Sequence, residues 1–150
     1  MILDKQNMLS EAQAVTASAV STNTIDLGVA RDLGPGEELS VAITVDVAAT
    51  AAGAATVDFQ IISSAAAALT SPTVLAATGP IAKTDLTLGR KTIEVKVPRA
   101  VLLAQPIGQR YFGIQYVVAT GPLTAGSFTA GLVVDFNDQK KDYPIGYSVV

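Results

Sequence analysis

Two acidic residues, Asp46 and Asp58, are the first candidates for chemistry in this sequence. Each lies on the polar face of an alternating stretch, and the two stretches are consecutive, so the carboxylates could approach each other. Paired carboxylates perform acid–base catalysis in glycosidases, and carboxylates also bind Ca²⁺. No Gly-rich or Asn-rich loop stands near either residue to supply further oxygen ligands. The pattern therefore favours two solvated charges on polar strand faces.

Two motifs that could bind an anion are more typical of turns. The stretch GPGEE (34–38) lacks the Lys and Ser/Thr of a phosphate-binding loop, and it precedes a strand rather than a helix. The stretch GRK (89–91) is a basic corner at the start of a strand, which favours a solvated turn over a phosphate site. Too few basic residues accompany it for a nucleic-acid-binding surface.

The composition removes the usual catalytic groups. The chain contains no Cys and no His, which excludes disulfides and thiolate metal sites and removes the commonest general base. No cluster of carboxylates, Lys or Tyr replaces them. We therefore expect a protein that is not an enzyme and that has no cofactor and no metal site.

Length and charge indicate one domain, residues 1–150. Hydrophobic residues make up 49% of the chain but aromatic residues only 5% and charged residues only 15%. Such a weakly charged surface fits a protein that partners partly cover, and the net charge of −3 disfavours nucleic acid. No run of about 18 apolar residues predicts a membrane helix, and the first residues lack the charge order of a signal peptide. We expect synthesis and use in a cytoplasm or in an assembly made there.

The candidate residues named above must lie on β-strands or in the turns between them, because the hydrophobic residues recur mainly with a period of two. The clearest strand is LSVAITVDV (39–47), and Pro98 ends another, KTIEVKVP (91–98). Further alternating stretches are ATVDFQIIS (55–63), RYFGIQYVVAT (110–120) and SFTAGLVVDF (127–136). With the weaker candidates AVTA, NTIDL, TVLAA and IAKTDL, about eight or nine short strands result, which is typical of an all-β antiparallel sandwich or barrel.

The connections between these strands are short. We expect AATAAG (48–53) to be a hairpin loop and GPLTAG (121–126) to join the last two strands as a hairpin. The stretch SSAAAALTSP (63–72) could form one helical turn or a loop that crosses between sheets.

Both ends of the chain have the composition of contact arms. The first, about residues 1–20, carries Leu3, Met8 and Leu9 as sparse apolar anchors in a polar strip. Such an arm can add a strand to a neighbour's sheet edge. The tail, about residues 137–150, carries Tyr143, Pro144 and Tyr147. Aromatic residues are scarce in this chain, so the tail either packs on its own sandwich or contacts another subunit.

Several stretches resemble one family. The opening MILDKQNMLSEAQAVTASAVSTNTIDLG closely resembles that of the small jelly-roll capsid cement proteins of tailed bacteriophages, of the type described from a Bordetella phage. Its marks are Met1–Asp4, Ser10–Thr16 and Ser21–Gly28, and GEELSVAITVD, RYFGIQYVV, GPLTAGSFTAGLVVD and the YPIGY ending are also similar. The likeness covers nearly the whole chain, and its motifs are structural rather than catalytic.

The resemblance implies a jelly roll of two packed four-stranded sheets and a role as a cement or decoration protein. Such a protein would bind the outer surface of a phage head, bridge adjacent major capsid proteins and associate with itself as a dimer or trimer. It would be made in the host bacterial cytoplasm. The net charge and the lack of a long apolar run predict no nucleic-acid and no membrane partner.

Two other functions remain open on the residues alone. A carbohydrate-binding β-sandwich is one alternative, although sugar binders usually expose aromatic rings and this chain contains no Trp and only four Tyr. A tail or fibre component of a virion is the other, although the absence of repeats counts mildly against a fibre.

Overall fold

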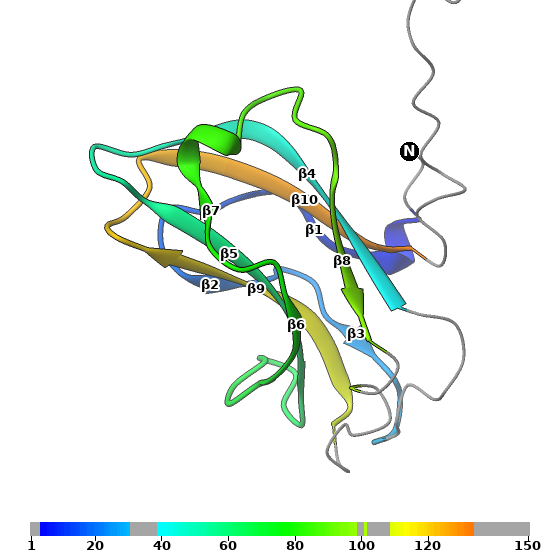
Figure 1. Ribbon diagram of the computed structural model, residues 1–150. Helices are drawn as coiled ribbons and strands as arrows, with labels where there is room; N and C mark the ends of the chain where they lie inside the picture. The colour runs from blue at the N-terminus through cyan, green and yellow to red at the C-terminus, as the bar shows by residue number, and fades with distance from the viewer. Residues whose placement is uncertain (1–3, 31–38, 99–100, 102–108, 134–150) are drawn as a thin grey trace, which may run out of the picture.

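The computed structural model describes residues 4–30, 39–98, 101 and 109–133. These residues form strands and two short 3₁₀ turns, arranged in two facing layers (Figure 1). The strands are β1 (Met8–Ala14), β2 (Ala19–Val20), β3 (Ile25–Asp26), β4 (Leu39–Thr50), β5 (Thr56–Ser64), β6 (Thr73–Ala77), β7 (Ile81–Ala82), β8 (Ile93–Val97), β9 (Tyr111–Ala119) and β10 (Ala125–Val133). The 3₁₀ turns are η1 (Lys5–Asn7) and η2 (Lys83–Asp85).

The strands form two antiparallel sheets. The 4-stranded sheet has the order β1-β10-β4-β8, and the 6-stranded sheet has the order β2-β9-β5-β6. The remaining short strands extend the second sheet, because β3 pairs with β9 beside β2 and β7 pairs with β5 beside β6. The predicted all-β antiparallel sandwich is therefore confirmed.

The order of the strands is that of a jelly roll. If β2 with β3, and β6 with β7, each count as one interrupted strand, eight strands remain, as in jelly rolls generally. Along the chain each strand then crosses to the opposite sheet, except at β5 and β6, which form a hairpin within one sheet. The fold that the resemblance implied is thus present in the described residues.

The two hairpins expected from the sequence are wrong. β4 and β5 lie in different sheets, so residues 51–55 cross between layers, and β9 and β10 are likewise in different sheets. Short loops between alternating stretches indicate that consecutive strands are near each other. They do not distinguish strands that pair side by side from strands that stack face to face.

The core lies between the sheets and contains most of the aromatic side chains that the structure describes. Phe59 on β5, Tyr116 on β9 and Phe128 on β10 are fully buried. Their ring centroids are 5.2 to 5.8 Å apart, with two edge-to-face contacts and one stacked contact. These rings supply large buried areas in a chain whose other core residues are mainly Val, Ile, Leu and Ala.

The Ala-rich stretch 63–72 has a different role from both alternatives that the sequence offered. It connects β5 to β6 and folds over the outer face of their own sheet, where Leu69 is buried beside Gly113 of β9. A Cβ atom at position 113 would meet the Leu69 side chain and would lie 2.9 Å from Ser21 Oγ. Glycine at this position therefore allows the loop to pack closely on the sheet.

Candidate interaction surface

The two candidate catalytic carboxylates do not meet. Asp46 is on β4 and Asp58 is on β5, and these strands belong to opposite sheets. Asp46 accepts a hydrogen bond of 2.6 Å from Thr129 Oγ1, whereas Asp58 accepts from Gln60 Nε2 at 2.8 Å and from Thr78 Oγ1 at 3.1 Å. The strands therefore do not bring the two carboxylates together, and each is a separate charge on the polar face of its strand, as the sequence favoured.

The predicted N-terminal arm is largely part of the sandwich. Residues 8–14 form β1, which pairs with β10, and residues 19–20 form β2. Leu9 is completely buried in the core and therefore offers no surface to a partner, which corrects its assignment as a contact residue. Met8 is half-buried at the start of β1, and the exposed residues 4–7 precede it.

The other predicted contact residues lie outside the described residues. They are Leu3 at the start of the chain and Tyr143, Pro144 and Tyr147 in the tail. Their assignment as partner contacts stays a prediction. The last described residue, Val133, ends β10, which lies between β1 and β4 in the 4-stranded sheet.

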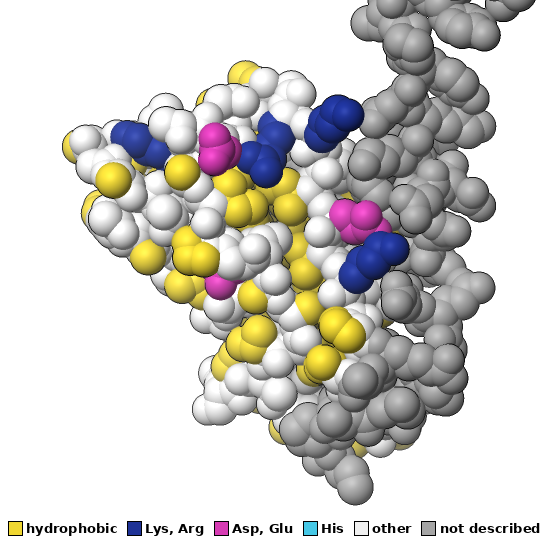
Figure 2. Space-filling model, viewed as in Figure 1, with side chains coloured by type: hydrophobic (Ala, Val, Ile, Leu, Met, Phe, Trp, Pro, Cys, Tyr) yellow, Lys and Arg dark blue, Asp and Glu magenta, His cyan; other side chains and the backbone are white. Residues whose placement is uncertain are grey.

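Basic side chains are grouped along the connection from β7 to β8. Lys83, Arg90 and Lys91 come from this stretch, and Figure 2 shows basic side chains along one border of the face, with an acidic side chain among them. Arg90 Nη1 donates to the Asp85 carbonyl at 2.5 Å, so the guanidinium stabilises its own turn. Leu88, 65% exposed, is in the same stretch. This border therefore combines positive charge with an exposed apolar side chain.

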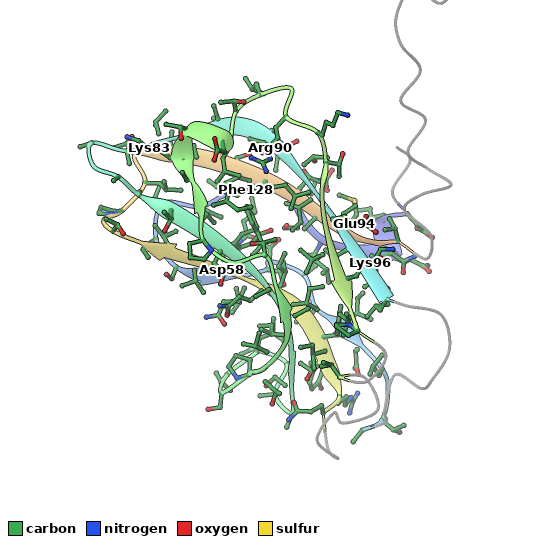
Figure 3. The ribbon with its side chains drawn as sticks, viewed as in Figure 1. Asp58, Lys83, Arg90, Glu94, Lys96 and Phe128 are labelled. Carbon is green, nitrogen blue, oxygen red and sulfur yellow. The ribbon has the colours of Figure 1, made fainter. Side chains whose placement is uncertain are left out.

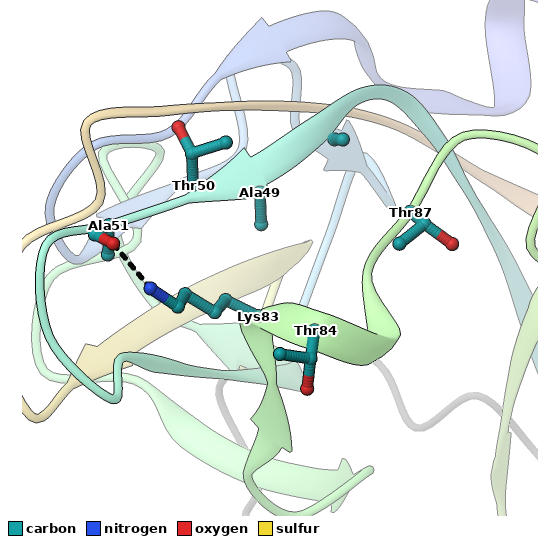
Figure 4. A pocket seen from close by; sticks show the side chains of 7 residues that line it. Ala49, Thr50, Ala51, Lys83, Thr84 and Thr87 are labelled. Carbon is teal, nitrogen blue, oxygen red and sulfur yellow. Dashed lines mark hydrogen bonds between the residues drawn. The ribbon is translucent and has the colours of Figure 1, made fainter.

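A shallow hollow lies at this border, between the end of β4 and η2 (Figure 4). Its volume is about 370 Å³, and its lining is mostly small: Ala48, Ala49, Thr50, Ala51, Lys83, Thr84 and Thr87. The Lys83 ammonium spans one side and donates to the Ala51 carbonyl. The lining therefore consists of alanine methyl groups, three threonine side chains and a lysine whose ammonium is already hydrogen-bonded.

An ion pair holds the end of β3 against the start of β9. Arg110 donates to both carboxylate oxygens of Asp26, at 2.6 and 2.7 Å, and Gly28 N–H donates to one of them at 2.8 Å. The hydrogen bond from Arg110 lowers the pKa of Asp26 to about 2. The guanidinium also lies 5.2 Å from the ring centroid of Tyr111. Sequence reasoning missed this group because its two charges are 84 residues apart.

The described residues contain no metal-binding constellation. No group of three or more acidic side chains is placed to hold an ion in that part of the chain. Within the same ranges, no helix is long and apolar enough to cross a membrane.

Comparison with known proteins places most of this sandwich in one family. A family model described as Bbp16 matches residues 9–132, from β1 to the penultimate residue of β10. The name suggests a Bordetella phage protein. No curated protein matches the chain.

Proposed function

The chain belongs to the Bbp16 family, and from that premise we propose that it is a capsid cement protein of a tailed bacteriophage. It binds the outer surface of the head and bridges adjacent major capsid proteins. The observation that carries this proposal is the family match across nearly the whole jelly roll, since a phage-related family is consistent with a virion component. The protein acts as a structural element and not as an enzyme.

The fold supports a mechanical role. A sandwich with a continuous core between two sheets is a rigid body, and rigid bodies transmit force between the subunits that they contact. The pressure of packaged DNA pushes shell subunits apart. A second protein that spans two of them adds contact area, and many weak contacts repeated over a lattice give high avidity.

The surface chemistry also supports contact rather than catalysis. The border around η2 offers a shallow hollow with small side chains, exposed Leu88 and basic groups, and we assign to it contact with a segment of the capsid protein. The tail with Tyr143 and Tyr147, which lies outside the described residues, is the second proposed contact. The protein is made in the host bacterial cytoplasm and functions on the virion.

Co-sedimentation with phage heads tests the proposal. Purified protein is mixed with expanded capsids that lack it, and bound copies are counted per shell. We expect saturable binding at a fixed ratio to the major capsid protein. Folded protein that leaves intact heads undecorated would contradict the cement role and favour a tail or fibre component, and a positive glycan array would instead favour a carbohydrate-binding module.

A tail variant tests the contact residues. Tyr143→Ala/Tyr147→Ala should weaken binding to heads while the unfolding midpoint of the isolated protein stays unchanged. Leu88→Ala tests the proposed contact at the η2 border in the same assay, and Val74→Ala, an exposed apolar side chain of β6 outside both proposed contacts, is the matched control. If the tyrosine variant unfolds, the tail belongs to the core and its assignment as a contact is wrong.

A further inference from the structure

The hollow between the end of β4 and η2 has walls that the fold holds in place. The Ala49 N–H donates to the Leu86 carbonyl at 2.9 Å, and the Lys83 N–H donates to the Ala55 carbonyl at 3.1 Å. Leu86 and Ala55 are buried in the core, so the 3₁₀ turn is fixed to the sandwich on both sides of the hollow. A surface that is already formed loses little conformational freedom on binding, which favours it as a recognition site.

Two cations at this border keep most of their hydrogen-bonding capacity. The half-buried Lys83 ammonium donates to the Ala51 carbonyl (Figure 4), and the exposed Arg90 guanidinium donates to the Asp85 carbonyl. Both acceptors are backbone oxygens, and each cation has further N–H donors. Within the described ranges, neither of the two side chains forms an ion pair. Both charges are therefore available to carboxylates of a partner.

The charge of this border is opposite to that of the chain as a whole. Residues 83–91 contain three basic side chains and a single acidic one, Asp85, whereas the chain has a net charge of −3. Figure 3 shows Lys83 and Arg90 along the same border of the molecule. A local excess of positive charge on an acidic protein attracts a negatively charged partner to that place and orients it.

The lining of the hollow indicates which kind of negative partner fits. Phosphate sites in proteins are built from clustered backbone N–H groups, but the N–H groups of Ala49 and Lys83 are already used within the fold. A nucleic acid would require a longer basic surface than this border offers. The hollow is shallow, with a volume of about 370 Å³, and alanine and threonine methyl groups line it. It therefore accommodates small apolar side chains of an extended peptide.

We propose that this hollow binds an extended acidic segment of the capsid protein, in which small apolar side chains alternate with Asp or Glu. An apolar side chain enters the hollow, and neighbouring carboxylates bind Lys83 and Arg90 at its border. The identity of the partner rests on the cement function proposed above, whereas the chemistry of the segment follows from the hollow itself. Each exposed ion pair contributes little, and repetition over the lattice of the shell makes the sum effective.

Amide NMR shifts of the full-length protein test the hollow without phage heads. The probe is the peptide acetyl-Glu-Val-Glu-Val-Glu-amide, and acetyl-Lys-Val-Lys-Val-Lys-amide is its control of opposite charge. We expect the acidic peptide to give saturable shifts at residues 48–51 and 83–88, and we expect added salt to weaken them because salt screens exposed charges. Equal shifts with both peptides, or no saturable shift with the acidic one, would contradict the proposal. Equal shifts with a DNA duplex would mean a general anion site and would contradict selection of a peptide.

Substitutions of opposite sign separate charge from folding. Lys83→Met and Arg90→Met should each weaken binding of the acidic peptide about threefold, whereas Lys83→Arg keeps the charge and should bind nearly as well. Asp85→Asn should tighten binding about twofold, because it removes a negative charge and keeps the backbone carbonyl that accepts from Arg90. A structural defect would not tighten binding. Lys5→Met, on η1 near the opposite end of the sheet, is the matched control and should have no effect. Circular dichroism of each variant checks the fold.

Co-sedimentation of the same variants with phage heads tests the identity of the partner. Arg90→Met should lower the affinity for heads and Asp85→Asn should raise it, whereas Lys5→Met should leave it unchanged. If wild-type protein decorates heads and all three variants bind them equally, the hollow is not the contact, although the cement function stands. If wild-type protein fails to bind heads, the cement function and the capsid protein as partner are both wrong, and the peptide titration alone then decides whether the hollow binds an acidic segment.

Discussion

The hydroxyl groups of Ser10 and Tyr116 hydrogen-bond to each other across the interior of the sandwich, from β1 in one sheet to β9 in the other. Both residues are completely buried. The Tyr116 ring also packs against Phe59 and Phe128, so this polar contact lies at the edge of the aromatic cluster. It is a specific link between the layers in a core that is otherwise held by non-directional packing.

Removing either hydroxyl should leave the other buried without a partner. We expect Tyr116→Phe and Ser10→Ala each to lower the free energy of unfolding by about 1–3 kcal/mol. The double variant Ser10→Ala/Tyr116→Phe should cost less than the sum of the two, because neither hydroxyl then remains unsatisfied. Urea unfolding of the four proteins measures the coupling. Strict additivity would mean that the two groups do not depend on each other.

Burial also makes the stability dependent on pH in the alkaline range. Desolvation raises the pKa of Tyr116 from 10.0 to about 12. The folded state holds this proton more tightly than the unfolded state. The stability that the protonated Tyr116 hydroxyl adds to the folded state is therefore complete below pH 10 and is lost as the pH rises to about 12. The loss amounts to roughly 3 kcal/mol for a shift of two pKa units.

Urea unfolding between pH 9 and pH 12 tests this dependence. Tyr116→Phe should flatten the loss of stability in that window, whereas the control Tyr111→Phe, a half-buried tyrosine of the same strand, should retain it. Equal slopes in the wild-type protein and in Tyr116→Phe would show that other groups cause the alkaline loss.

The strands could be predicted from the sequence because alternation is a local property. The stretches around Val57, Ile93 and Phe128 form strands and bury the faces that alternation assigned to the core. The pairing of those strands could not be predicted in the same way. Whether β9 stacks on β10 or pairs with it depends on how both sheets close, and the loop between them fits either arrangement.

The assignment of surface and core shows the same division. Leu9 looked like an exposed anchor because few large side chains surround it in the sequence, yet β1 places it in the core beside strands from the other end of the chain. The pair Asp26 and Arg110 was missed for the same reason, since neither charge has a local partner. The local sequence pattern indicates secondary structure. Contacts between residues about a hundred positions apart in the sequence determine which side chains remain exposed to a partner.

Gly113 of β9 should be more sensitive to an added methyl group than Gly126 of β10. A Cβ atom at position 113 collides with Leu69 and closely approaches Ser21 Oγ, whereas at position 126 the nearest atom is 3.4 Å away. Gly113→Ala should therefore cost about 1–3 kcal/mol and displace the 65–72 loop, as overpacking does. Gly126→Ala should cost clearly less. Urea unfolding measures both, and equal costs would mean that the loop adapts freely.

The ion pair between Asp26 and Arg110 should respond to acid rather than to alkali. Because Arg110 and Gly28 N–H stabilise the carboxylate, the pKa of Asp26 falls from 3.8 to about 2. The folded state releases this proton more readily than the unfolded state. The stability that the ionised Asp26 carboxylate adds to the folded state is therefore present above pH 4 and is lost as the pH falls to about 2. NMR titration of the Asp26 carboxyl carbon follows this group directly. In Arg110→Met the midpoint should return toward the ordinary value, whereas Arg110→Lys should shift it only in part, since Lys cannot form the bidentate contact. A midpoint near 3.8 in the wild-type protein would mean that the two side chains are not paired in solution, and that β3 is held on β9 by its backbone hydrogen bonds alone.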